Sequence, residues 1–140
     1  MHISSSYNVY VMFQWNATSK SAGLGWSVKN TGRNSGFQAT AELVASPLVA
    51  EGLAMKNAVK TCKELGLRQI RYKSDSTQLI KALNSKTEPP EIYGIVSDIR
   101  IECMEFETFY FVWTRERNIV ADRLAKQALS RVSSGFITLL

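Results

Sequence analysis

The sequence predicts an α/β fold in which helices flank one five-stranded mixed sheet, an arrangement also described as α+β. Before residue 46, three stretches rich in β-branched and aromatic residues are separated by short turn segments, which is typical of an antiparallel meander. After residue 46, strand and helix patterns alternate, which indicates strands joined through helices. The expected order is βββαβααβα. All 140 residues fit one domain, with a core at about 7–131 and a tail at 133–140.

The first three strands are expected at 7–16, 22–29 and 37–45. In the first of them apolar side chains recur at every second position, which predicts one strongly apolar face made of Tyr7, Val9, Val11, Phe13 and Trp15. The segments NATSKS (16–21) and NTGRNSG (30–36) contain the residues that favour turns. Short connections of this kind predict that neighbouring strands pair in antiparallel fashion.

A hydroxyl followed by a proline predicts where the first helix begins. Ser46 fits the N-cap and Pro47 the first helical position, where no N–H is needed. The helix should run to Leu65, with Gly66 making the turn that follows it. The remaining elements are expected as a strand at 68–73, a helix at 74–84, a helix at 92–106, a strand at 107–113 and a helix from Asn118 to about Val132.

The charge of the chain favours an anionic partner. Seventeen Lys and Arg against twelve acids give a net charge of +5 and a pI near 9.4, and the first acid in the chain is Glu42. Nucleic acid is the first partner to consider for such a composition. Lys56, Lys60 and Lys63 share one face of the first helix, which is either a solvated face or an edge that contacts phosphates.

The composition also suggests where the protein works. Cys62 and Cys103 fall in helical patterns far apart in the chain, which favours buried thiols in a reducing compartment over a disulfide. The chain opens without a secretory signal pattern and has no apolar run long enough to span a membrane. We therefore expect a soluble intracellular protein, with nucleus or cytoplasm left open.

Three acids stand at the beginnings of predicted helices. Glu51 heads an apolar row of the first long helix, Asp75 follows a strand, and Asp122 lies in the first turn of the last helix. Each has an ordinary explanation as an acid that is favoured near a helix N-terminus. Together they could converge on a divalent ion, because oxygen ligands suit Mg²⁺ and Mn²⁺.

Four segments of the chain, taken in order, carry a family resemblance. They are WNATSKSAGLGW (15–26), SPLVAEGLAMKNAV (46–59), YKSDSTQLIKALNS (72–85) and RERNIVADRLAKQAL (115–129). They resemble the signature segments of ribonuclease H, most closely those of the reverse-transcriptase-like branch that is abundant in plants. The resemblance covers about residues 7–131 and implies a ribonuclease H-like fold.

The resemblance also implies a chemistry. In that family four carboxylates bind two Mg²⁺ ions, which activate water to cut the RNA strand of an RNA–DNA hybrid. Glu51, Asp75 and Asp122 match the second, third and fourth acids, and Met12 stands where the first acid is expected. Two dications about 4 Å apart repel by on the order of 15 kcal/mol at an effective dielectric near 20, and a neutral thioether does not offset that repulsion.

Other groups offer only a partial substitute for the missing acid. Gln14 and Asn16 share the expected face of Met12, but their amide oxygens are neutral. A single Mg²⁺ or Mn²⁺ ion held by Glu51 and Asp75, with Asp122 as a further candidate ligand, remains an alternative to the usual pair of ions.

Three functions follow as hypotheses. The first is a monomeric domain that binds RNA–DNA hybrid or double-stranded RNA and whose hydrolysis is weak or lost. Its phosphate contacts would come from Lys56, Lys60, Lys63, Arg115, Arg117, Arg123 and Lys126, and its minor-groove contacts from the turn that contains Gln14, Asn16 and Thr18. The second is an active metal-dependent endoribonuclease with an altered metal site. The third is a non-enzymatic interaction scaffold derived from a mobile element.

Overall fold

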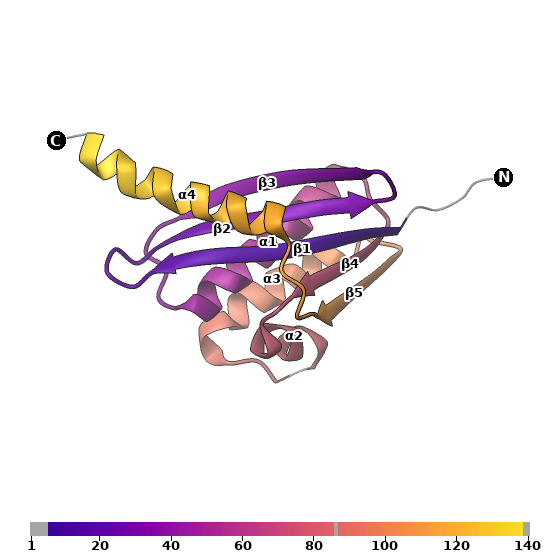
Figure 1. Ribbon diagram of the computed structural model, residues 1–140. Helices are drawn as coiled ribbons and strands as arrows, with labels where there is room; N and C mark the ends of the chain where they lie inside the picture. Colours follow the sequence, from indigo (N-terminus) through magenta and orange to yellow (C-terminus); the bar gives the residue numbers. More distant parts are fainter. Residues whose placement is uncertain (1–5, 86, 139–140) are drawn as a thin grey trace.

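One five-stranded sheet with helices on both faces forms the domain, as Figure 1 shows. The computed structural model describes residues 6–85 and 87–138, with side chains described as far as residue 132. In chain order the elements are β1 (Ser6–Asn16), β2 (Ser21–Asn30), β3 (Arg33–Ala41), α1 (Pro47–Glu64), β4 (Gln69–Ser74), α2 (Thr77–Asn84), η1 (Pro90–Ile92), α3 (Tyr93–Cys103), β5 (Thr108–Trp113) and α4 (Ile119–Thr138).

The sheet is mixed, as the sequence predicts. Its strand order is β3-β2-β1-β4-β5. The first three strands pair in antiparallel fashion, and β1–β4 and β4–β5 are parallel pairs. Parallel strands need long crossover connections, which here are the segments that contain α1, α2 and α3.

The hairpin between β2 and β3 is tighter than expected. Only Thr31 and Gly32 separate the two strands, and Gly32 has the positive φ of 78° that such a turn requires. The strand β3 therefore begins at Arg33 and ends at Ala41, so the prediction of a seven-residue turn and a strand at 37–45 was wrong. The segment NTGRNSG contains several residues that favour turns. The pairing of Asn30 with Arg33 places the turn at Thr31 and Gly32.

Both faces of β1 are covered, not only the predicted apolar one. Val9 and Val11 lie in the main core beneath α1, whereas Met12 packs on the opposite face against α4. The helix α4 lies over β1, β2 and β3 (Figure 1). Met12 is therefore buried although it lies at an even position of β1, because a second helix covers it.

Two glycines of β2 let α4 come close to the sheet. A Cβ atom at Gly25 would overlap the carbonyl oxygen of Ala121, and one at Gly23 would overlap that of Ala125. Backbone therefore packs against backbone at this contact. Since Met12 pairs with Gly25 across the β1–β2 ladder, the contact also fixes where α4 lies relative to position 12.

The helix boundaries show how each helix begins. Ser46 caps α1 through a hydrogen bond from the Val49 N–H at 3.2 Å, as predicted from the sequence. The cap of α2 is Ser76, so this helix begins three residues later than expected and Asp75 lies just outside it. The helix α4 continues to Thr138, through most of the residues that were expected to form a tail.

None of the helices in the described ranges combines the length and the apolar character needed to cross a membrane.

Candidate functional site

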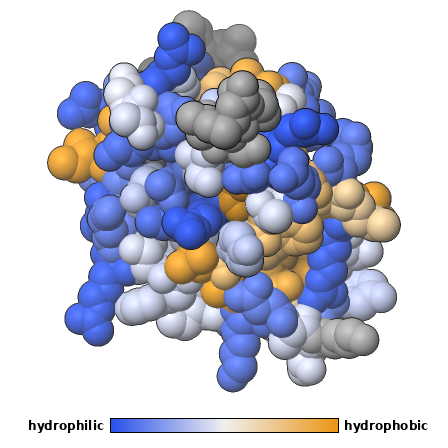
Figure 2. All heavy atoms as spheres, turned by 90° about the vertical axis from the view of Figure 1, so that its right-hand side faces the viewer, coloured by the Kyte–Doolittle hydropathy of each residue, from blue (hydrophilic) through white to orange (hydrophobic). Residues whose placement is uncertain are grey.

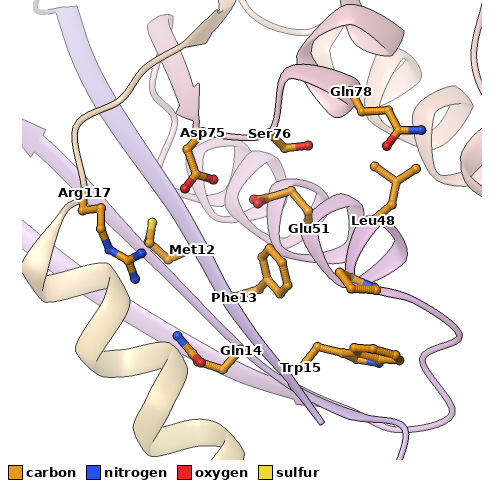
Figure 3. A pocket seen from close by; sticks show the side chains of 11 residues that line it. Met12, Phe13, Gln14, Trp15, Leu48, Glu51, Asp75, Ser76, Gln78 and Arg117 are labelled. Atoms are coloured by element: carbon orange, nitrogen blue, oxygen red, sulfur yellow. The ribbon is translucent and has the colours of Figure 1, made fainter. Parts of the chain in front are cut away.

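A cavity of about 600 Å³ lies at the C-terminal end of β1. It is bounded by β1, the first turns of α1, the beginning of α2 and the connection between β5 and α4 (Figure 3). Its lining residues are Met12, Phe13, Gln14, Trp15, Pro47, Leu48, Glu51, Asp75, Ser76, Gln78 and Arg117. The cavity therefore contains two of the three acids that the sequence singled out.

Glu51 is a buried acid that forms no ion pair with any residue that the structure describes. Its side chain projects from α1 into the cavity, the residue is 1% exposed, and neither carboxylate oxygen has a hydrogen-bond partner among the described residues. Burial, together with the charge of Asp75, raises the pKa of Glu51 to about 8, and the nearby Ser74 hydroxyl only partly opposes this. Burial therefore favours the protonated form of Glu51.

Asp75 supplies the second carboxylate. It follows the end of β4 and is exposed, and Figure 3 shows its side chain directed toward the same space as Glu51. Its backbone carbonyl accepts a hydrogen bond from Trp113 Nε1 at 3.1 Å, which ties the end of β4 to the end of β5. The chain thus brings Glu51 and Asp75 together, as the sequence predicts.

Asp122 is held by other partners. Its Oδ1 lies 2.8 Å from Arg117 and its Oδ2 lies 3.1 Å from Lys126, while Gln14 Nε2 donates to Oδ1 at 3.2 Å. Partial burial acts to raise the pKa of Asp122, but hydrogen bonds from Lys126 and Arg117 outweigh it and lower that pKa. Asp122 does not line the cavity with Glu51 and Asp75.

The arrangement leaves the site short of metal ligands. Across residues 6–85 and 87–138 no three acids, histidines or cysteines are grouped so that they could hold a metal ion. The sequence suggested that Glu51, Asp75 and Asp122 converge, and the structure brings the first two together but not the third. Asp122 is paired with Arg117 and Lys126 instead.

Met12 forms part of the cavity wall between α4, which carries Asp122, and the side chains of Glu51 and Asp75. It is 7% exposed and packs against Ala121 and Ala125 of α4, and it also lines the cavity. A thioether carries no charge and is a poor ligand for Mg²⁺. The wall at this point is therefore neutral, although β1 places position 12 between α4 and the acids across the cavity.

Arg117 is a member of the site that sequence reasoning assigned only to phosphate contacts. It lines the same cavity as Glu51 and Asp75 while it pairs with Asp122. Its position depends on the course of the β5–α4 connection, which no local pattern predicts. The pairing of Asp122 with Lys126 is different, because a spacing of four residues on a helix could have indicated it.

Two of the lysines of α1 form ion pairs with acids of α3. Lys56 pairs with Asp98 at 2.9 Å, and Lys63 pairs with Glu102 at 2.7 Å and with a further acid in the loop after α3. Lys60 is exposed. Two of the three lysines are thus engaged within the chain, which argues against a phosphate-contacting stripe and for an ionic contact between two helices.

The other residues expected to bind nucleic acid are exposed or half-buried. Asn16 Oδ1 accepts hydrogen bonds from the N–H groups of Thr18 and Ser19, at 2.9 and 3.0 Å, and so shapes the β1–β2 turn. Arg123 is exposed on α4. The guanidinium of Arg115 lies 5.8 Å from the centre of the Trp113 ring, which is a cation–π contact.

The sheet order and the helices on both faces define a ribonuclease H-like domain, and solved structures share this fold. The N-terminal RNase H domain of rv2228c from Mycobacterium tuberculosis superposes with a TM-score of 0.82 at 17% identity, over 94% of this chain and 99% of that one. RNase H1 from the archaeon Halobacterium salinarum NRC-1 superposes with a TM-score of 0.75 at 20% identity, over 90% of this chain and 98% of that one. LC11-RNase H1 in complex with an RNA/DNA hybrid superposes with a TM-score of 0.76 at 20% identity, over the same shares of the two chains.

The sequence itself identifies the family. Residues 8–128 match the reverse transcriptase-like family model, so the chain belongs to that family. A search of curated proteins finds no significant match. The domain thus has the ribonuclease H fold, and the expectation drawn from the four sequence segments is confirmed at the level of family and fold.

Proposed function

We propose that this protein is a nucleic-acid-binding domain of the ribonuclease H type that binds RNA–DNA hybrid and hydrolyses it weakly or not at all. The observation that carries the proposal is the neutral wall at Met12 together with the ion pairs of Asp122. Hydrolysis with two metal ions needs anionic ligands around both ions. Of the acids that the family resemblance assigns to this task, only Glu51 and Asp75 face the cavity.

The donor set fits one divalent ion better than two. Glu51 offers two carboxylate oxygens that have no partner among the described residues, and Asp75 offers a second carboxylate from across the cavity. These are ligands that Mg²⁺ or Mn²⁺ prefers, and such an ion would polarise a bound phosphate. A second ion would depend on Asp122, which has two cations as partners, and on a thioether.

Basic and polar groups around the cavity support binding to nucleic acid. Arg115, in the connection after β5, and Arg123, on α4, are exposed, and the turn containing Asn16 and Thr18 lies at the end of β1. LC11-RNase H1, a protein with this fold, has been crystallised with an RNA/DNA hybrid. Phosphate contacts of this kind make affinity fall steeply as salt rises, with a slope that reflects the number of phosphates contacted.

The decisive experiment compares the wild type with Met12→Asp and Met12→Asn. Asparagine matches aspartate in shape but carries no charge, so it controls for the change in packing. We expect all three proteins to bind hybrid in filter-binding or anisotropy assays, and only Met12→Asp to cleave it in Mg²⁺. Cleavage by the wild type at the rate of Met12→Asp would refute the proposal.

An active enzyme with an altered site is the second candidate, and the facing pair of Glu51 and Asp75 favours it. It predicts cleavage by the wild type in Mn²⁺ that is lost in Asp75→Asn. The third candidate, a scaffold without nucleic-acid binding, predicts that the affinity for hybrid is no greater than that of an unrelated protein of equal charge at every salt concentration.

A further inference from the structure

The strand β5 leaves one side of the sheet open. It is an edge strand, and its sequence TFYFVW contains no charged residue and no proline. Tyr110 is 57% exposed and Trp113 is 43% exposed. Figure 2 looks at the side of the molecule that is on the right in Figure 1, where β5 begins, and apolar side chains gather on it. Edge strands are normally protected by charges, prolines or bulges, because an unprotected edge pairs with another strand.

The backbone of β5 presents groups for such pairing. The N–H groups of Thr108 and Thr114 donate to carbonyls on the β4 side, at Arg68 and Ser74. Since neighbouring residues of a strand point their backbone groups in opposite directions, those of Phe109, Phe111 and Trp113 face away from β4.

One of these outward groups has a partner within the chain. Asn84 Nδ2 donates to the Phe111 carbonyl at 2.9 Å. A carbonyl oxygen has two lone pairs, so the same oxygen can still accept a bond from a second strand.

We propose that β5 pairs with β5 of a second copy in antiparallel fashion, with Phe111 opposite its own counterpart. This register makes the strand complementary to itself. Tyr110 lies opposite the partner's Val112, and Phe109 lies opposite the partner's Trp113. The first pair joins an aromatic to a β-branched side chain and the second joins two aromatic side chains. Cross-strand pairs of both kinds stabilise neighbouring strands.

Charged residues flank β5, and they favour a second copy of this chain as the partner and one register of the pairing. Glu107 precedes the strand and Arg115 follows it by two residues. In the proposed register Glu107 lies opposite the partner's Arg115 at one end, and symmetry repeats the pair at the other end. Opposite charges therefore meet at both ends of the uncharged segment, which a second copy of this chain satisfies without any other partner.

This dimer replaces the expectation of a monomer drawn from the sequence. In this register only the five β5 residues 109–113 lie opposite β5 residues of the partner, so the contact is small, and the association should be weak and should depend on protein concentration. The resulting sheet would have ten strands across the two copies, with the two cavities at separate places because β1 lies two strands away from the edge.

Sedimentation equilibrium of the full chain without nucleic acid tests the dimer, over concentrations from micromolar to about a millimolar. We expect the wild type to dimerise reversibly. Glu107→Arg and Arg115→Glu should each weaken dimerisation by about tenfold or more, because each places like charges opposite one another at both ends. The double variant should restore it, since the charges are then exchanged but still complementary.

Lys60→Glu, at an exposed position of α1, is the matched control and should dimerise like the wild type. Circular dichroism melting of each variant shows whether it is folded. A wild type that stays monomeric over the whole range overturns the proposal. So does a dimer that none of the charge reversals affects, or a double variant that stays as weak as the single ones. Hybrid binding is measured separately, so a failure here leaves the proposed function untouched.

Discussion

Replacing Glu51 with glutamine is expected to change how the stability of the protein depends on pH. Glu51 is almost completely buried and forms no ion pair within the described part of the chain, and its pKa is raised from an ordinary value of 4.5 to about 8 by burial and by Asp75. In the unfolded chain the same carboxyl group is exposed and ionises near its ordinary value. Folding therefore opposes the ionisation of this group.

The sign and the size of the effect follow from these two values. Between about pH 4.5 and pH 8 the folded protein keeps the proton that the unfolded chain has lost, so the free energy of unfolding falls as pH rises through this range. At 1.36 kcal/mol per pKa unit, the complete loss is on the order of 5 kcal/mol above pH 8. Glutamine cannot ionise, so Glu51→Gln should remove this contribution and be more stable than the wild type above pH 8.

Urea denaturation followed by circular dichroism at several pH values from 4 to 9.5 measures this difference. Near pH 4 the two proteins should differ by no more than about 1–3 kcal/mol, which is the cost of a buried amide without a partner. Near pH 9 the variant should be the more stable protein. Parallel curves for the two proteins across the whole range would refute the reasoning.

The same measurement probes the metal. An ion held by Glu51 and Asp75 would favour the ionised carboxylate, so Mg²⁺ or Mn²⁺ should stabilise the wild type more at pH 9 than at pH 5. Glu51→Gln should lose this pH-dependent gain. Equal stabilisation of both proteins would show that the ion binds elsewhere.

Two further predictions concern the scaffold. Gly25→Ala should destabilise the protein by about 2 kcal/mol or more in thermal or urea unfolding, because the new Cβ would overlap backbone of α4. Gly66→Ala, whose Cβ would meet nothing within 4 Å but whose φ is +71°, should cost only about 1 kcal/mol. Ser46→Ala removes the hydroxyl that caps α1 and donates to Glu91, and should cost about 1 kcal/mol, whereas Ser46→Thr keeps a hydroxyl and should retain most of the stability.

Much of the fold could be predicted because the signals are local. The cap at Ser46, the glycine at 66 and the alternation along β1 each depend on neighbours within a few residues, and the element order and the mixed sheet are confirmed. The boundaries of β3 could not be predicted, since the turn residues from 30 to 36 fit several hairpins and the register across β2 selects one.

The site was predictable only in part for a similar reason. Glu51 and Asp75 meet because one lies near the start of α1 and the other follows β4, and both positions can be read from local patterns. The partners of Asp122 include Gln14, which is 108 residues away in the chain, and the helix α4 brings the two together. The contact joins two distant segments, so the sequence of either segment alone does not predict it.

The contact of α4 with Gly23 and Gly25 holds the helix on the sheet next to residue 12. The helix is anchored through main-chain atoms and small alanine side chains, none of which carries charge. Met12 packs on that anchor through Ala121 and Ala125, so a substitution at residue 12 changes both the packing beneath α4 and the charge of the cavity wall. Aspartate and asparagine have nearly the same shape, so a comparison of these two side chains at residue 12 separates the effect of charge from the effect of packing.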